Sequence, residues 1–116
     1  MKLYGIPNWN TVKKARVWLE QHGVAYEFHD FKKQGLASAT VEKWLAQYPW
    51  EKLVNRAGMT WRNLSDAEKI AVTDSNAATT LMLNKTSVIK RPILEDDNKV
   101  LALGFDETVY QQIFKQ

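Results

Sequence analysis

Hydrophobic positions in the first third of the chain switch from a strand period to a helical period and back. The opening run KLYGI is short, apolar and typical of a strand. Val12, Ala15 and Leu19 then recur at helical spacing, so a helix is expected after the first loop. Residues 24–31, VAYEFHDF, alternate apolar and polar side chains, which predicts a second strand. A strand, helix, strand unit of this length implies that the two strands are parallel.

The middle of the chain has helical spacing only. One apolar face of a first helix is predicted from Val41, Trp44, Leu45 and Tyr48. The segment SDAE has the form of a capping box, with Ser65 as the cap and Glu68 at the third helical position. A further helical piece is predicted at AATTLML, before Asn84. We therefore expect a helical insertion at about residues 38–85.

The last thirty residues are predicted to form a hairpin and a closing helix. ILE and KVLAL are strand-like, and Asp96, Asp97 and Asn98 between them favour a turn. Asp106 can cap a helix whose apolar side is formed by Val109, Tyr110, Ile113 and Phe114. The element order predicts an α/β fold with a mixed (α+β) sheet, thioredoxin-like, with the helical insertion between its βαβ and ββα halves.

Composition and charge restrict the class of protein. A chain of 116 residues with 45% hydrophobic and 25% charged residues is typical of one domain, here spanning residues 1–116. No apolar run approaches the roughly 18 residues of a membrane span, and the N-terminus lacks a leader pattern, so a cytoplasmic protein is expected. The net charge is +3, but the lysines are scattered singly or in pairs, which argues against a nucleic-acid partner.

Cysteine is absent from the chain, which excludes disulfides, thiolate catalysis and cysteine-bound metal. His22 and His29 are the two histidines, and no carboxylate–histidine cluster with ligand spacing accompanies them. The sequence therefore predicts no metal site.

Four segments resemble the arsenate-reductase-like ArsC/Spx family, and most closely its small YffB-type branch. They are LYGIPNWNTVKKARVWLEQHGVAYEFHDFK, NRAGMTWRNLSD, SVIKRPIL and LGFDETVYQQIF, which together cover nearly the whole chain in the family's order. The family's first motif is usually LYGIxxCDTxxKA, with a nucleophilic cysteine in the loop before the first helix. In this sequence Trp9 stands at the cysteine position, and Asn10 follows in place of the aspartate.

The resemblance implies a glutathione-dependent thiol or arsenate reductase, but Trp9 removes the family's nucleophile. Backbone N–H groups and the dipole at a helix N-terminus favour a thiolate, and they can also hold an oxyanion or a carboxylate of glutathione. A tryptophan has only an indole N–H to offer. Thr11 carries the nearest hydroxyl, which would need an adjacent base to act as a nucleophile. We assign no catalytic residue.

By resemblance, Arg91 contacts an anionic substrate and Pro92 is the cis-proline of the thioredoxin-like fold. A solvated strand arginine and an ordinary trans proline are the alternatives. Asn10 and Thr11 belong to the same predicted anion site at the helix N-terminus. Arg56 in NRAG resembles another family position, with a surface ion pair as its alternative. Trp9 itself would either fill the ligand cleft or form an apolar wall for a new ligand.

Three functions remain open from the sequence. The first is a non-catalytic homologue that binds a small anion, a thiol such as glutathione, or a protein partner. The second is an active reductase that works by chemistry the sequence does not reveal. The third is a regulator resembling the Spx branch, which acts through protein contacts. No required cofactor is predicted, and glutathione enters only as a ligand or co-substrate implied by the resemblance.

Overall fold

The computed structural model describes residues 1–115, and the chain divides into two compact units. The sheet unit consists of Met1–Gly35 and Arg91–Gln116, and the helical unit consists of Leu36–Lys90. The helical unit contains the segment at about residues 38–85 that the sequence predicts to be an insertion.

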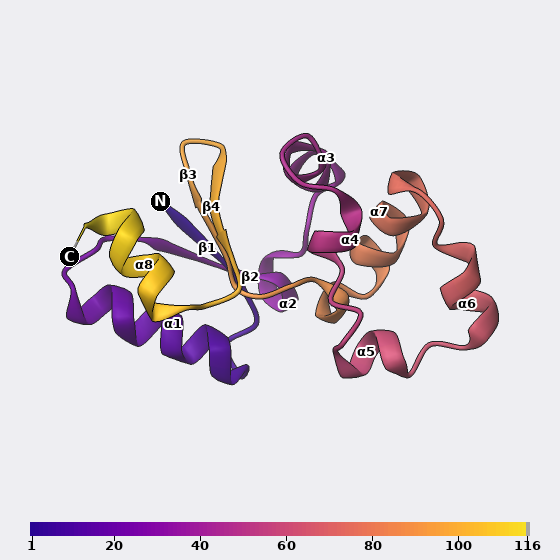
Figure 1. Ribbon diagram of the computed structural model, residues 1–116, viewed down its shortest axis with the longest axis horizontal. Helices are drawn as coiled ribbons and strands as arrows, with labels where there is room; N and C mark the ends of the chain where they lie inside the picture. The colour runs from indigo at the N-terminus through magenta and orange to yellow at the C-terminus, as the bar shows by residue number, and fades with distance from the viewer. Residues whose placement is uncertain (116) are drawn as a thin grey trace. The chain divides into compact units, whose positions relative to one another are not determined.

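The described part of the sheet unit is built around a four-stranded mixed sheet (Figure 1). The strands are β1 (Lys2–Gly5), β2 (Glu27–Asp30), β3 (Ile93–Asp96) and β4 (Lys99–Leu103), in the spatial order β2-β1-β3-β4. β1 runs parallel to β2, whereas β3 is antiparallel to both β1 and β4. The predicted α/β class with a mixed sheet is confirmed.

Strand β2 is shorter than the alternating pattern of residues 24–31 predicts. It ends at Asp30, whose carboxylate accepts hydrogen bonds from the backbone N–H groups of Lys32 and Lys33 at 2.9 and 3.4 Å. Asp30 thereby caps the short helix α2 (Phe31–Gln34). The cap turns the chain out of the strand before Phe31, which the alternation alone did not indicate.

One face of the sheet is covered by α1 (Asn10–Gln21) and α8 (Glu107–Phe114) (Figure 1). Their shared core contains Leu3, Leu94, Ala102, Ala15, Trp18, Leu19 and Tyr110, all buried. Gly5 lets the first turn of α1 approach β1, since a Cβ there would lie 2.8 Å from a Val12 methyl carbon. Val109 was predicted on the apolar side of α8 but is 40% exposed.

The opposite face of the sheet carries a buried polar pair. The Tyr4 hydroxyl donates to Glu95 Oε1 at 3.2 Å, and both side chains are almost inaccessible to solvent. Burial, followed by the negative charge of Glu95, raises the pKa of Tyr4. The pair joins the neighbouring strands β1 and β3 through their side chains.

The helical unit is made of short helices in its described residues. They are α3 (Ser38–Leu45), α4 (Trp50–Leu53), α5 (Met59–Arg62), α6 (Asp66–Ala71), α7 (Ser75–Asn84) and the 3₁₀ turn η1 (Thr86–Val88). An isolated antiparallel bridge, Val54 to Ile89, joins the residue after α4 to the residue after η1. Tyr48 was predicted on the first of these helices, but α3 ends at Leu45. Pro49 disfavours helical geometry at Tyr48, the residue before it, which agrees with Tyr48 lying outside α3 but does not explain the end at Leu45.

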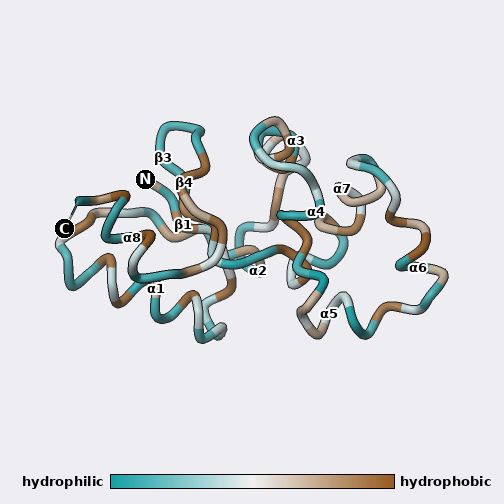
Figure 2. Tube along the Cα trace, in the orientation of Figure 1, coloured by the Kyte–Doolittle hydropathy of each residue, from teal (hydrophilic) through white to brown (hydrophobic). Residues whose placement is uncertain are grey.

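Local sequence signals for turns and caps are confirmed where they were specific. Ser65 and Glu68 form a complete capping box at the start of α6. The hairpin turn uses Asp97 and Asn98 with φ values of 50° and 66°, and it is visibly hydrophilic in Figure 2. Asp106 caps α8 by accepting from the Val109 N–H at 3.2 Å.

Candidate functional site

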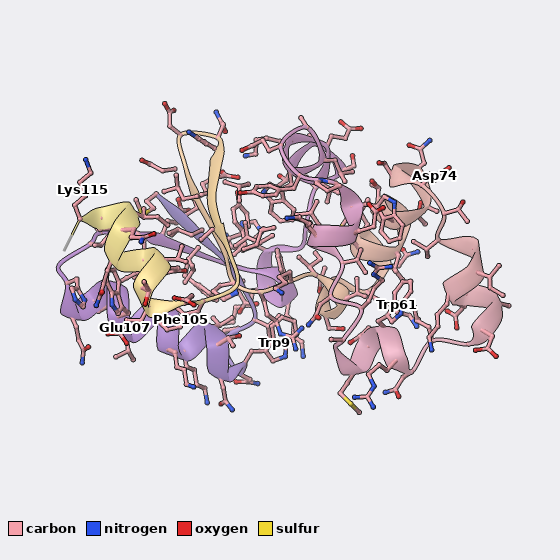
Figure 3. The ribbon with its side chains drawn as sticks, in the orientation of Figure 1. Trp9, Trp61, Asp74, Phe105, Glu107 and Lys115 are labelled. Carbon is pink, nitrogen blue, oxygen red and sulfur yellow. The ribbon has the colours of Figure 1, made fainter. Side chains whose placement is uncertain are left out.

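Trp9 is the N-cap residue of α1, the longest helix in the described chain (Figure 3). Its backbone N–H donates to the Ile6 carbonyl at 3.2 Å, and its carbonyl accepts from the Lys13 N–H at 2.9 Å. The Trp9 side chain makes no capping hydrogen bond, so it supplies no acceptor to the first turn of α1. The helix start therefore keeps the partial positive charge that an anionic ligand would meet.

The Arg91 side chain lies flat against Trp9. The central guanidinium carbon is 3.3 Å from the centroid of the Trp9 ring, and both side chains are partly buried. Burial lowers the pKa of Arg91, but a guanidinium remains protonated at neutral pH. A cation over an indole face is worth about 2 kcal/mol when it is desolvated. Trp9 thus occupies the position of the family's cysteine and holds the predicted anion-binding arginine.

The other predicted residues of the sheet unit surround this pair. The Thr11 hydroxyl donates to the Arg91 carbonyl at 3.4 Å, and the Arg91–Pro92 peptide bond is cis. Asn10 is the first residue of α1 and is exposed. A carbonyl oxygen accepts a hydrogen bond but does not act as a base, so this contact does not activate the Thr11 hydroxyl.

Arg56 belongs to the helical unit and makes a different contact. Its guanidinium carbon lies 5.7 Å from the centroid of the Trp50 ring, and the side chain is exposed. The assignment of Arg56 to the same anion site as Arg91 stays a prediction.

The stacking of Arg91 on Trp9 was not foreseen from the sequence. The two residues lie near opposite ends of the chain, and no local pattern connects them. The signal was present only indirectly, because Trp9 and Arg91 fall in two motifs that both belong to the family's site. In the observed contact the Trp9 ring covers one face of the Arg91 guanidinium.

Membrane-spanning helices and metal-binding clusters are both absent from residues 1–115. Every helix there is too short or too polar to cross a membrane. No group of three or more histidine, aspartate or glutamate side chains lies close enough to hold a metal ion in this part of the chain. The histidines contact backbone instead, with His22 Nδ1 2.8 Å from the Trp18 carbonyl oxygen and His29 Nε2 2.8 Å from that of Gly35.

Residues 4–113 match the ArsC family. The matched range includes residues of both units, and it contains Trp9 and Arg91. The chain belongs to the ArsC family. An uncharacterized protein of Haemophilus influenzae is 40% identical to it over 112 residues, covering 97% of this chain and 96% of the relative. The global transcriptional regulator Spx of Streptococcus mutans is 26% identical, over 90% of this chain and 76% of the regulator.

Solved structures of related proteins have the same fold as this ArsC-family chain. A YffB protein superposes with a TM-score of 0.89 at 43% identity, covering 96% of both chains. An arsenate reductase (ArsC) related protein from Brucella melitensis has a TM-score of 0.79 at 46% identity, covering 99% of this chain and 94% of that one. The resemblance to the ArsC/Spx family and its YffB-type branch is confirmed, as is the thioredoxin-like fold.

Proposed function

We propose that this ArsC-family protein binds a small anionic ligand at the start of α1 without catalysing thiol chemistry. The observation that carries the proposal is the contact of Arg91 with Trp9, the residue at the family's cysteine position. A chain without cysteine cannot form the thiolate on which the family's reductase chemistry depends. Glutathione, with two carboxylates, is the ligand class that the family resemblance favours.

The charge of the site supports an anion as the ligand. Arg91 carries a full positive charge beside the N-terminal end of the twelve-residue helix α1, where the helix dipole adds in the same sense. The Trp9 ring removes solvent from one face of the guanidinium, which strengthens its interaction with a carboxylate. A planar guanidinium can donate two parallel hydrogen bonds to such a group.

Glutathione titration of the labelled protein tests this proposal by two-dimensional NMR. Saturable shifts are expected at the Trp9 indole N–H and at the backbone amides of Asn10 and Thr11. Arg91→Ala is expected to weaken glutathione binding about tenfold or more, because a charge-assisted contact contributes about 1.5–3 kcal/mol. Arg16→Ala serves as the matched control, since it removes an equal charge that lies over an aromatic ring, that of Phe28, in the same unit.

Each result of this titration has a distinct meaning. Equal losses in Arg91→Ala and Arg16→Ala would show that the overall positive charge, and not Arg91 itself, governs binding, which would refute the role of Arg91. Absence of shifts at millimolar glutathione, sulfate and arsenate would refute the anion-binding proposal. Turnover of glutathione-linked substrates by the purified protein would refute the non-catalytic part and favour the active reductase.

A protein partner is the second candidate function. Its support is the similarity to a relative named as a transcriptional regulator, Spx of Streptococcus mutans. A partner that binds through the same surface would shift the Trp9 and Asn10 resonances without glutathione, and its affinity would fall in Arg91→Ala. Chromatography with candidate transcription proteins, followed by that titration, distinguishes this function from small-anion binding.

A further inference from the structure

The sheet unit has an open groove that the Trp9–Arg91 site does not use. It has a volume of about 390 Å³ and lies along α1 and the start of α8. Lys13, Lys14, Val17 and Trp18 line it from α1, and Phe105 and Glu107 line it from the other side. Figure 3 shows Phe105 and Glu107 together where α8 begins.

The apolar part of the groove combines an exposed side chain, Val17, with two packed aromatic rings, those of Trp18 and Phe105. Val17 is 49% exposed, an unusual position for a valine on a helix whose other valine is buried. Trp18 is only 4% exposed, because its ring stacks on His22 with centroids 3.8 Å apart and packs edge-on against Tyr110 with centroids 5.5 Å apart. Phe105 also packs edge-on against Tyr110, with ring centroids 4.8 Å apart. The aromatic surfaces are therefore held in place before any ligand arrives.

The charges of the groove are not neutralised by their neighbours. Within residues 1–115, Lys13, Lys14 and Glu107 form no ion pair, although other charged groups of the sheet unit do, such as the N-terminal ammonium with Asp96. Two lysines against one glutamate leave a net positive charge around an apolar surface. Such a groove attracts anions and disfavours cations.

One buried donor lies under the same surface. The indole Nε1 of Trp18 is shielded from solvent and donates to no acceptor among the described residues. An unsatisfied buried donor costs about 1–3 kcal/mol, and this one is shielded, so it is not itself a contact for a ligand in the groove. The indole N–H resonance of Trp18 also provides a local reporter of binding.

We propose that this groove binds a small amphipathic anion, a ligand with a flat apolar body and one acidic group. The apolar body lies against Val17, Trp18 and Phe105, and the acidic group is held by Lys13 and Lys14. The volume falls in the range of small-molecule pockets, roughly 300–1,000 Å³. This site is separate from the proposed anion site, which uses Arg91 and Trp9.

A second copy of the chain fits the groove less well than a small molecule. Specific protein interfaces bury upward of about 1,000 Å² and have an apolar centre. In the described part of the sheet unit, Val17 and Val109 are the large apolar side chains that are exposed. Two valines are too few to form such a centre, whereas one of them is enough to cover a small aromatic ring.

Anilinonaphthalene sulfonate is the probe that tests the proposal, because it joins a flat apolar ring system to one sulfonate. We expect saturable fluorescence enhancement, with NMR shifts at the Val17 methyl groups and the Trp18 indole N–H. The double variant Lys13→Gln with Lys14→Gln should weaken binding about tenfold, as expected for two exposed charge contacts. The matched control is Lys32→Gln with Lys33→Gln, an exposed lysine pair on α2 outside the groove, which should bind normally.

A neutral probe and the variant Val17→Asp test the charged and the apolar contacts of the groove separately. Phenylnaphthylamine, which has the same rings without the sulfonate, should bind equally well with and without the two groove lysines. Val17→Asp should abolish binding of both probes, whereas Ile70→Asp, at a residue 75% exposed on α6, should not. Far-ultraviolet circular dichroism of each variant checks that the fold is intact.

Three results would overturn the proposal. They are failure of the dye to bind, dye binding without shifts at Val17 and Trp18, and equal affinity in the groove and control lysine variants. Sedimentation provides a further test, since a dimer that Val17→Asp converts to monomer would identify a second copy as the occupant. Arg91→Ala should leave the dye-induced shifts at Val17 and Trp18 unchanged, so failure of this proposal and failure of glutathione binding are distinguishable.

Discussion

The protein contains the same chemical pair, an arginine over a tryptophan ring, in two different regions. In the sheet unit the Arg91 guanidinium carbon lies 3.3 Å from the Trp9 centroid, and both residues are partly buried. In the helical unit the Arg56 guanidinium carbon lies 5.7 Å from the Trp50 centroid, and Arg56 is exposed. Trp9 caps the start of a twelve-residue helix, whereas Trp50 is the first residue of a four-residue helix.

The comparison separates residue type from environment. A guanidinium close to an indole in a partly dehydrated site interacts more strongly than one that solvent screens, roughly 2 against 0.5–1 kcal/mol. Only the longer helix has a dipole large enough to add to the effect of the arginine. Tryptophan and arginine together therefore do not define a site, and the surrounding fold determines which pair can act on a ligand.

Replacing each tryptophan by cysteine should produce the largest difference between the two regions. Trp9→Cys places a thiol at the N-cap of α1 beside Arg91, which should lower its pKa from about 8.5 into the range of about 6–7. Trp50→Cys should keep a thiol with a nearly ordinary pKa. The chain has no other cysteine, so the reaction rate with a disulfide reagent against pH reports each thiol directly.

At pH 7 the Trp9→Cys protein should react about threefold faster than the Trp50→Cys protein, because its larger thiolate fraction outweighs the lower nucleophilicity of a low-pKa thiolate. Because the pKa is lowered, its reactivity should persist as the pH falls toward 6, where the Trp50→Cys thiol is almost fully protonated. Equal pH profiles for the two thiols would show that the start of α1 no longer has the electrostatic character of the family's site.

Double-mutant cycles should give the next largest difference. The coupling free energy between Trp9→Leu and Arg91→Met is expected to be about 1–2 kcal/mol, measured by urea unfolding. The matching cycle of Trp50→Leu with Arg56→Met should give no more than about 0.5–1 kcal/mol. Coupling energies that are equal, or larger in the helical unit, would contradict the role assigned to burial.

The smallest expected difference is between two threonine hydroxyls, Thr11 in the sheet unit and Thr60 in the helical unit. Here the helical unit is expected to show the larger loss of unfolding free energy. Thr11 donates to the Arg91 carbonyl at 3.4 Å in an exposed position, whereas the Thr60 and Ser87 hydroxyls lie 2.7 Å apart and partly buried. Thr60→Val should therefore cost about 1 kcal/mol of unfolding free energy, and Thr11→Val about 0.5 kcal/mol or less. A larger cost for Thr11→Val would indicate that its hydroxyl positions Arg91 more firmly than the distance suggests.

Local signals in the sequence predicted most of the secondary structure. The capping residues Ser65 and Asp106 and the turn residues Asp97 and Asn98 act through neighbours a few positions away, so their effects can be predicted from short segments. Predictions based on periodicity alone were less accurate at element ends. Strand β2 and helix α3 both end earlier than their patterns suggest, and at β2 the reason is the Asp30 cap that starts α2.

Motifs named the residues of the candidate site, Arg56 among them, but did not indicate their geometry. Trp9, Asn10, Thr11, Arg91 and Pro92 were all named from motifs, and the fold brings their segments together. The stacking of Arg91 on Trp9 depends on side-chain packing between segments distant in sequence, for which no local rule exists. The groove beside Val17 was missed for the same reason, since helical spacing does not reveal what the facing element leaves uncovered.

The sequence by itself determined the fold class, the family and the absence of a cysteine nucleophile, because these follow from periodicity, motif order and composition. Only the tertiary structure decided which arginine is partly dehydrated against a tryptophan and which lysines border an uncovered apolar groove. Both properties depend on how much solvent the surrounding side chains exclude. Solvent exclusion arises when elements far apart along the chain pack together, so residue identity alone does not specify it.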